Sequence, residues 1–237
     1  MLATLLQNEV KKYMTNLVRR IKLLSFAKRV GVGLFLLLLA ACSETNEEND
    51  EFAAWQTQND TYYEQVYQTA QSAIAAGDGS WKIIRQWSLP AAYTPSATQC
   101  VVAHVITAGS GTTCPLYSDT THVSYVGRLI PSASYPTGYE FERTYRGEFN
   151  AATAIPVKLG VSKTYVSSSS GSISESSNIE GMTTVLQQMH VGDRWEVYMP
   201  YAMAYGASDQ GSVPAYSTLI FDLYLHDYWH AGASERK

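Results

Sequence analysis

The sequence predicts an α+β fold in which one short helix packs on an antiparallel β-sheet, and residues 181–228 carry this prediction. Residues 182–189 place apolar side chains at the i, i+3, i+4 and i+7 spacing of one helical face, and Gly192 follows where a left-handed C-cap is expected. Residues 194–199 and 219–226 alternate between two faces, as half-buried strands do. A one-sided helix beside two such strands is typical of a helix lying on an antiparallel sheet.

Further strands are expected upstream of this unit. The alternation is clear in residues 122–129, where Tyr125 and Gly127 share one face and Ser124 and Val126 lie on the other. The expected upstream strands are residues 81–89, 100–107, 122–129, 140–143 and 155–159.

An N-terminal helix is expected in residues 51–80, ahead of the sheet. Residues 51–76 contain neither Pro nor Gly, and the Gly-Asp-Gly sequence of residues 77–79 ends the run. Aromatic and aliphatic side chains form a partly amphipathic stripe along this helix. The stripe predicts packing against the following domain, and a dimerising arm is the alternative.

A signal peptide is expected in residues 1–41. Five Lys and Arg in residues 19–29 precede an apolar run in residues 30–41, which is shorter than the roughly 20 residues of a spanning helix. The run ends in Leu-Ala-Ala-Cys, which resembles a bacterial lipobox, and this implies lipidation of Cys42. We therefore expect a cell-envelope lipoprotein of a Gram-negative bacterium, held at the outer membrane on its periplasmic face or at the cell surface. Met14 leaves a later start codon open, and a buried apolar helix followed by an ordinary cysteine is the alternative.

The charge of the remaining chain argues against nucleic acid as a partner. Seven of the 17 Lys and Arg and one of the 21 Asp and Glu lie in residues 1–41, which leaves 10 basic against 20 acidic residues. Phosphate contacts need clustered Lys and Arg, and the sequence after Cys42 has no such cluster. Residues 42–50 are acidic and polar, so we expect a solvated tether between the lipid and the folded part.

Cys100 and Cys114 are the cysteines that follow Cys42, and two alternatives are open for them. Export would place both in an oxidising compartment, where a disulfide closes the loop between them. Two buried thiols fit the same pattern.

A serine-rich insertion is expected in residues 161–178. Its centre, residues 167–177, has too little apolar surface to order itself, so we expect it to be flexible. Residues 231–237 are expected to form a C-terminal tail.

Common catalytic motifs are missing from the sequence. It contains no GxSxG elbow, Walker loop, HExxH motif or CxxC pair. His226 and His230 stand beside Asp227 near the C-terminus and make a poor metal site, so we expect neither a metal nor a cofactor. Aromatic side chains are instead abundant in loops, with Tyr205 and Tyr216 as examples.

Six short motifs resemble the FKBP-type peptidyl-prolyl isomerases in their order and spacing, over about residues 98–229. They are VSYVGRL (123–129), GYEFERT (138–144), IEGM (179–182), VGDRWEVYMP (191–200), AYGAS (204–208) and VPAYSTLIFDLYL (213–225). The resemblance implies an isomerase domain in residues 81–230, with an antiparallel sheet of five or six strands wrapped around one short helix.

The resemblance also implies the residues of the site. The implied catalytic residues are Tyr125, Phe141, Glu142, Tyr205 and Phe221, and the implied substrate-binding residues are Ile179, Met182, Val213 and Val157. Tyr205 would donate to the substrate carbonyl, the backbone N–H of Ile179 would bind a neighbouring acceptor, and Ile155 is an alternative to Val157. Glu142 stands where the family usually has Asp, and Met182 stands where it commonly has the tryptophan of the pocket floor.

The expected chemistry needs no acid or base. Rotation about an X-Pro bond faces a barrier of roughly 18–20 kcal/mol because the amide must give up its resonance, and no bond breaks. A pocket that binds the twisted amide better than either planar form accelerates this rotation. We therefore expect a peptidyl-prolyl cis-trans isomerase that assists the folding of exported proteins. A non-catalytic chaperone or peptide-binding module of the same fold, anchored to the envelope, is the alternative.

The expected partners follow from this chemistry. They are proline-containing unfolded or exported polypeptides, and the membrane through the lipid on Cys42. Met182 in place of the flat indole is expected to weaken binding of macrolide inhibitors.

Overall fold

The computed structural model describes residues 52–167 and 173–233. The signal peptide, the lipid on Cys42 and the acidic tether that the sequence predicts lie outside the described residues, as do the last four residues of the tail. Every described helix and strand belongs to one compact unit, residues 51–237.

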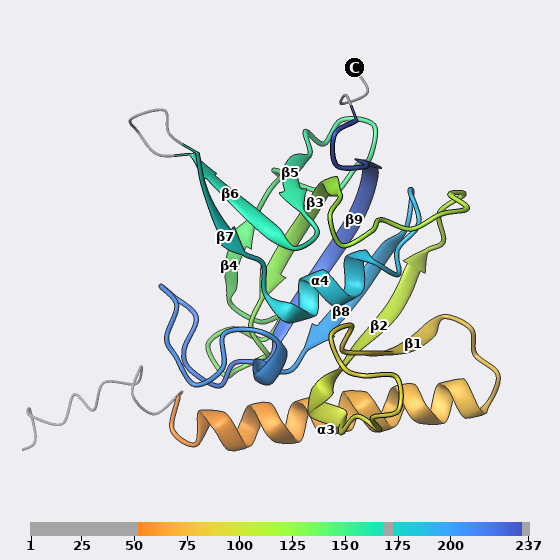
Figure 1. Cartoon of the computed structure of the whole chain (residues 1–237). Coiled ribbons are helices and arrows are strands. Elements are labelled where there is room, and N and C mark those ends of the chain that lie inside the picture. The colour runs from red at the N-terminus through yellow and green to blue at the C-terminus, as the bar shows by residue number, and fades with distance from the viewer. Residues whose placement is uncertain (1–51, 168–172, 234–237) are drawn as a thin grey trace, which may run out of the picture. The chain divides into compact units, whose positions relative to one another are not determined.

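The described elements are two α-helices, nine strands and two short 3-10 turns (Figure 1). In chain order they are α3 (Trp55–Ala75), β1 (Trp81–Arg85), η1 (Ala97–Gln99), β2 (Cys100–Thr107), β3 (Thr120–Arg128), β4 (Glu140–Arg143), β5 (Val157–Gly160), β6 (Lys163–Ser167), β7 (Ile173–Ser177), α4 (Glu180–Leu186), β8 (Arg194–Met199), η2 (Tyr201–Met203) and β9 (Leu219–Trp229).

Seven strands form one antiparallel sheet in the order β1-β2-β8-β9-β3-β4, and β5 pairs with β3. The predicted α+β class is confirmed, but the expected number of five or six strands is wrong. The sheet is larger because it includes β1, which lies upstream of the six motifs of the sequence analysis and pairs with β2 over all of its own residues. In addition, β4 and β5 are separate strands that pair with different ends of β3.

Helix α4 packs on one face of the sheet, which we call the inner face. Trp195, Val197 and Met199 of β8 are buried there, as their alternation predicts. The helix ends at Leu186, three residues before its predicted end, because a turn follows it. Met189 is nevertheless buried in the core, which explains why the apolar spacing continues to it.

Helix α3 packs on the opposite, outer face of the sheet, toward the β1 end (Figure 1). Tyr63 and Ala70 are buried against Val102 of β2, and the Tyr63 hydroxyl donates a 2.5 Å hydrogen bond to the Cys100 carbonyl. Tyr62 lies against Tyr198 of β8, with ring centroids 6.5 Å apart. The predicted packing of this helix against the domain is therefore confirmed.

Strand β1 is shorter than predicted, since it ends at Arg85 and not at residue 89. The Arg85 guanidinium donates hydrogen bonds to the carbonyls of Leu89, Pro90 and Tyr93, at 3.3, 2.7 and 3.3 Å. These contacts hold the following segment as a loop folded back on the strand end.

The serine-rich insertion contains a two-stranded antiparallel sheet, in which β6 pairs with β7 from Lys163–Ser177 to Ser167–Ile173. The prediction that residues 167–177 are flexible is therefore wrong for β7. Backbone pairing between two adjacent segments needs no buried apolar side chain, so composition did not reveal it. Residues 168–172 lie outside the described residues.

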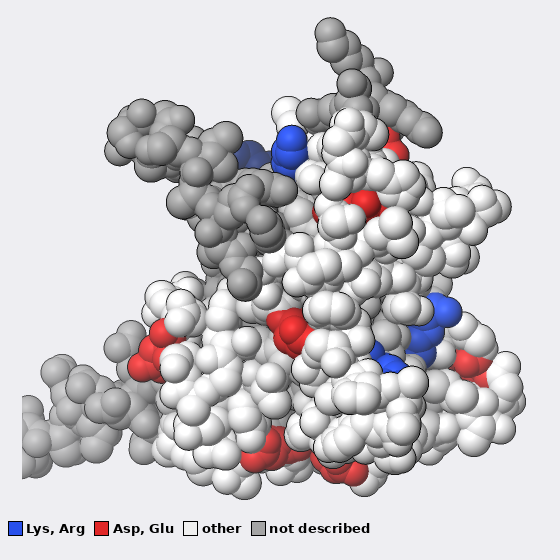
Figure 2. Space-filling model, viewed as in Figure 1, with Lys and Arg blue, Asp and Glu red and all other residues white. Residues whose placement is uncertain are grey.

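Cys100 and Cys114 are free thiols in the structure, and Cys100 is buried. Of the two alternatives for this pair, the structure has the thiols. Among the described residues, no helix has both the length and the hydropathy to cross a membrane. The face seen in Figure 2 carries its acidic and basic side chains in small separate groups, with mostly uncharged surface between them.

Candidate active site

Three aromatic rings from neighbouring strands meet on the inner face of the sheet. Phe221 of β9 is 3% exposed, and its ring centroid lies 5.8 Å from those of both Tyr125 and Phe141. Both contacts are edge-to-face, with interplanar angles of 74° and 90°. Tyr125 and Phe141 are half-buried and pack against the core. The three residues therefore present a partly exposed aromatic surface with Phe221 at its base.

An irregularity in the pairing of β3 with β4 places Phe141. Gly127 is opposite Glu142, but Arg128 is opposite Glu140, so Phe141 is an extra residue in a β-bulge. A Cβ on Gly127 would lie 2.6 Å from the Phe141 ring and 2.9 Å from the Phe221 ring. The bulge therefore directs Phe141 over Gly127, and only glycine leaves room for both rings there.

Glu142 and Tyr125 are joined across the same two strands. The Tyr125 hydroxyl donates a 2.8 Å hydrogen bond to Glu142 Oε1. Burial of the ring raises the pKa of Tyr125, and the negative charge of Glu142 raises it further. Tyr125 is therefore a neutral donor whose hydroxyl Glu142 holds in place.

Tyr205 lies in the loop after η2 and is half-buried against the core. Burial is the main cause that raises its pKa above the ordinary value of 10.0, and the charge of Glu142 adds to it. Tyr125 and Tyr205 also interact electrostatically with each other. Tyr205 thus packs against the same core cluster as Tyr125 and Phe141.

The start of α4 supplies Ile179 and Met182. Ile179 is the N-cap residue and half-buried, and its backbone N–H donates to Oδ1 of Asn178 at 3.0 Å. Met182 is 3% exposed and belongs to the same core cluster as Phe221. Met182 is therefore part of the buried core that also contains Phe221, and the backbone donor of Ile179 is engaged by the neighbouring side chain.

Val157 and Val213 complete the set of predicted residues. Val157 begins β5 opposite Val123 and packs against the core, whereas Ile155 is 83% exposed. Ile155 is therefore excluded as the alternative to Val157. Val213 is 3% exposed and is held in a tight turn by mutual backbone hydrogen bonds with Gln210, at 2.8 and 2.9 Å.

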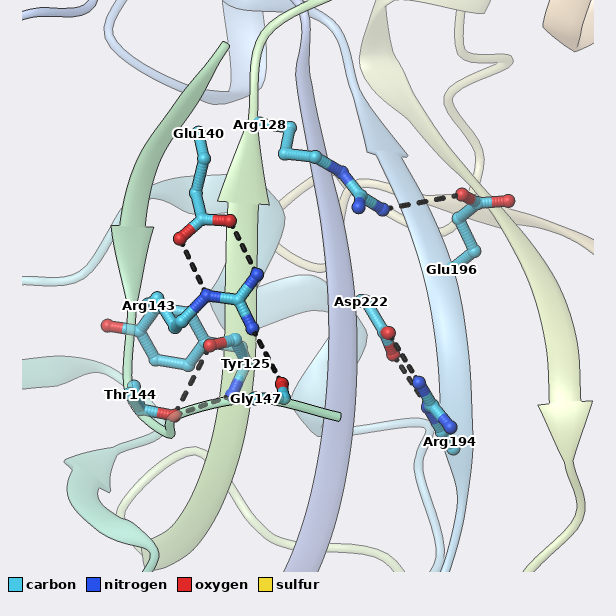
Figure 3. Close-up of polar contacts among 9 residues, drawn as sticks. All are labelled: Tyr125, Arg128, Glu140, Arg143, Thr144, Gly147, Arg194, Glu196 and Asp222. Atoms are coloured by element: carbon cyan, nitrogen blue, oxygen red, sulfur yellow. Dashed lines mark hydrogen bonds and ion pairs between the residues drawn. The ribbon is translucent and has the colours of Figure 1, made fainter. Parts of the chain in front are cut away.

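Polar contacts on β3 and β4 support this arrangement (Figure 3). Thr144 Oγ1 accepts the backbone N–H of Tyr125 at 2.9 Å, and the Thr144 N–H donates to the Tyr125 carbonyl at 3.0 Å. Arg143 binds both carboxylate oxygens of Glu140, at 2.6 and 2.5 Å, and donates to the Gly147 carbonyl at 3.2 Å. The end of β4 is thus fixed to β3 at Tyr125.

A second ion pair fixes β9 to β8 on the outer face. Arg194 donates to both carboxylate oxygens of Asp222, at 2.8 and 2.7 Å (Figure 3). The Phe149 ring covers the guanidinium at 4.7 Å. Because Asp222 follows Phe221 in the chain, this pair holds the strand segment that carries the base of the site.

Residues 112–226 match the protein-family model described as FKBP-type peptidyl-prolyl cis-trans isomerase. The match covers slightly less than half of the chain, and this region is similar to that family. All nine residues implied by the resemblance lie inside the matched region, whereas α3, β1 and β2 precede it.

One relative and two solved structures describe this similarity. The macrophage infectivity potentiator of Trypanosoma cruzi is 36% identical over 122 residues, which cover 42% of this chain and 62% of that protein. This chain thus spans less than two thirds of that relative. A peptidyl-prolyl cis-trans isomerase of Pseudomonas syringae pv. tomato str. DC3000 has 21% identity and a TM-score of 0.42, covering 70% of this chain and 94% of its own. FkpA from Escherichia coli has 22% identity and a TM-score of 0.46, covering 83% of this chain and 69% of its own.

Three residues of the candidate site were not among the predicted ones. They are Gly127, which gives room to two rings, Thr144, which fixes Tyr125, and Asn178, which engages the Ile179 N–H. A glycine inside an alternating strand is a signal of close approach and would have indicated Gly127. The role of Thr144 depends on its pairing with Tyr125, 19 positions away in the chain, which no local pattern contains. Asn178 engages the residue that follows it, and no predicted pattern included this contact. Within residues 52–167 and 173–233 there is no group of three His, Cys, Asp or Glu side chains that could hold a metal ion.

Proposed function

We propose that the FKBP domain of this chain catalyses cis-trans isomerisation of X-Pro peptide bonds. The observation that carries this proposal is that half-buried Tyr125, Phe141 and Tyr205 pack against the core cluster that contains buried Phe221 and Met182. Apolar walls of this kind suit a proline ring, and the neutral phenols supply the few polar groups that fix a ligand in such a pocket.

The mechanism is differential binding of the twisted amide. The aromatic surface of Phe141, Tyr125 and Phe221 takes the proline ring, and Tyr205 donates to the carbonyl before the proline. Rotation removes the amide resonance, so the bond loses its double-bond character and the carbonyl turns relative to the proline ring. A donor placed for the twisted form then stabilises the transition state more than either planar form. No proton leaves the enzyme, which agrees with hydroxyls whose pKa values are raised.

The natural substrates in this proposal are exported proteins during their folding. The support is the sequence of residues 1–42, in which a basic segment, an apolar run and a lipobox-like end precede Cys42. Lipid on Cys42 would hold the domain at the outer membrane of a Gram-negative bacterium, and residues 42–50 would act as the tether. Labelling with a radioactive fatty acid tests this part: label on the wild type and none on Cys42→Ser is expected, and an unlabelled wild type would exclude the lipid.

A protease-coupled assay with a chromogenic proline tetrapeptide tests the activity. Uncatalysed isomerisation of the X-Pro bond takes tens of seconds and appears as the slow phase of this assay. The wild type is expected to make this phase much faster than the uncatalysed reaction. Phe141→Ala is expected to abolish most of this acceleration because it removes one wall, and Tyr205→Phe to reduce it because it removes a donor. Ile155→Ala is the matched control, since that side chain is 83% exposed and outside the site. A wild-type rate equal to the uncatalysed one would exclude the proposed activity.

A non-catalytic chaperone or peptide-binding module is the second candidate function. Two observations favour it: a flexible thioether at Met182 in place of a flat ring, and the engagement of the Ile179 N–H by Asn178. Met182→Trp discriminates between the two functions. A large gain in turnover from a base near zero would favour the second function, as would suppression of client aggregation that Phe141→Ala leaves unchanged.

A further inference from the structure

The start of α3 is hydrogen-bonded to the loop that carries two of the site residues. We call residues 200–218 the site loop, because they contain Tyr205 and Val213. Trp55 Nε1 donates to Ser217 Oγ at 2.9 Å, and Asn59 Oδ1 accepts the backbone N–H of Thr218 at 2.7 Å. Asn59 Nδ2 in turn donates to the Trp55 carbonyl at 2.8 Å, so the two helix residues also fix each other.

These contacts are shielded from water. Trp55 is 6% exposed, and Asn59 and Thr218 are fully buried. A buried backbone N–H that loses its acceptor costs about 1–3 kcal/mol, which makes the Asn59 contact difficult to replace. Ser217 Oγ continues the chain of contacts by donating to the Pro214 carbonyl at 2.7 Å, next to Val213.

The site loop contains a residue with a strained backbone, Tyr216, which lies between the α3 contacts and the Tyr205 segment in the chain of hydrogen bonds. Tyr216 has a φ of 62°, in the left-handed region that a bulky residue adopts at a cost of about 1–2 kcal/mol. Its N–H donates to the Gly206 carbonyl at 2.8 Å, and Gly206 follows Tyr205 in the chain. Strain of this kind persists only where the surroundings determine the backbone on both sides. On one side, the hydrogen bond to Gly206 fixes the backbone of Tyr216 to the segment that carries Tyr205. On the other side, Trp55 and Asn59 fix Ser217 and Thr218, the two residues that follow Tyr216.

We propose that Trp55 and Asn59 are positioning residues that hold Tyr205 and Val213 in the geometry of the site. This inference rests on the proposed isomerase function. It assigns a role in the site to α3, which precedes the region matched by the FKBP family model. The N-terminal helix is then part of the catalytic unit and more than a spacer before it.

Variants of the full chain test this role, with a matched control on the same helix. Trp55→Phe removes the N–H that reaches Ser217 and keeps most of the ring, and Asn59→Ala removes the acceptor for Thr218. Tyr63→Phe is the control, because it removes a buried hydrogen bond from α3 that goes to Cys100 in β2 and not to the site loop.

Three measurements separate positioning from general stability: denaturant unfolding, the kcat and KM of the proline-peptide assay, and hydrogen exchange of the site loop. All variants are compared where they are fully folded. We expect kcat/KM to fall roughly 5- to 20-fold in Trp55→Phe and Asn59→Ala. The loss should be chiefly in kcat, because a catalytic group displaced by about 1 Å lowers the rate of the bound substrate's reaction more than it weakens substrate binding. Exchange of residues 204–218 should rise in the same two variants. Tyr63→Phe should lose stability but keep kcat/KM and the exchange pattern of the loop.

The proposal is overturned if both variants keep the wild-type kcat/KM and the wild-type exchange of residues 204–218. It is also overturned if Tyr63→Phe reproduces their effects, because general destabilisation would then explain them. Should Trp55→Phe fail to fold, Ser217→Ala removes the same contact from the loop side and is expected to give the same result. An inactive wild type would instead exclude the proposed function, and the exchange experiment would still decide whether α3 holds the loop.

Discussion

The hydroxyl of Tyr125 donates a 2.8 Å hydrogen bond to Glu142, and the two residues come from the neighbouring strands β3 and β4. The sequence has glutamate where FKBP domains usually have aspartate, which left the reach of this carboxylate open. The structure shows that the longer side chain contacts the tyrosine of β3. Its charge also contributes to the raised pKa values of both Tyr125 and Tyr205. Glu142 therefore acts on both phenols of the site.

Removal of the Glu142 carboxylate is expected to lower activity. Glu142→Ala leaves the Tyr125 hydroxyl without its acceptor, and the ring is then free to turn from the site. Because Glu142 is exposed, we expect a moderate loss of roughly 3- to 10-fold in kcat/KM in the proline-peptide assay. Glu142→Gln keeps an acceptor oxygen and should lose no more than half of the activity. Equal activity of Glu142→Ala and the wild type would show that this hydrogen bond does not matter for turnover.

Gly127→Ala is expected to disrupt the aromatic surface. The added Cβ would lie 2.6 Å from the Phe141 ring and 2.9 Å from the Phe221 ring, so both rings must move. Overpacking of this kind costs about 1–3 kcal/mol of unfolding free energy. Urea denaturation measures the loss, and the near-ultraviolet circular dichroism should change because the environment of Tyr125 changes with the two rings. Gly79→Ala is the control, since a Cβ there meets no atom within 4 Å; similar losses in both variants would contradict the prediction.

The parts of the fold that the sequence predicted are those with a strict local period. Strand β8 occupies the six residues that alternate, and the helical spacing located α4 to within a few residues. The hairpin of β6 with β7 was missed because its pairing is between backbones, and a serine-rich composition does not exclude that. Similarly, β1 ends early because the Arg85 side chain binds the loop that follows, a contact that strand periodicity does not contain.

The candidate site was predictable as a set of residues but not as a geometry. The resemblance implied Phe141 and Glu142, yet the bulge that directs Phe141 over Gly127 depends on the register of β4 with β3. The contacts of Trp55 and Asn59 with the site loop join residues about 160 positions apart in the chain, with separations of 162 and 159. Aromatic residues on α3 predicted that it packs on the domain, but not which loop it holds.

Activity is expected to be constant with pH from about pH 6 to about pH 9. The donor form of Tyr205 is the neutral hydroxyl, and an acid with a raised pKa keeps its proton to a higher pH. Because the pKa of Tyr205 lies above 10.0, the donor is lost only at more alkaline pH. A protease-free assay, such as exchange between the cis and trans peptide signals in nuclear magnetic resonance, measures kcat/KM over this range. A decline with a midpoint inside the range would show that another group titrates in the mechanism.

The Ile179 N–H is expected to bind substrate more tightly once Asn178 no longer engages it. In the structure this N–H donates to Asn178 Oδ1 at 3.0 Å, so a substrate carbonyl must first displace the amide side chain. A neutral hydrogen bond contributes about 0.5–1.5 kcal/mol net, so Asn178→Ala should lower the KM for the proline peptide roughly 2- to 10-fold. The kcat should change less, because the bond that is exchanged exists in both planar and twisted forms of the bound peptide. Asn178→Asp retains an oxygen acceptor and is the matched control, with a KM at or above that of the wild type. If Asn178→Ala raised the KM instead, its weaker contacts with the Gly160 and Val161 carbonyls, at 3.4 and 3.5 Å, would be the ones that hold Ile179 in place, and Asn178 would support the site rather than compete for it.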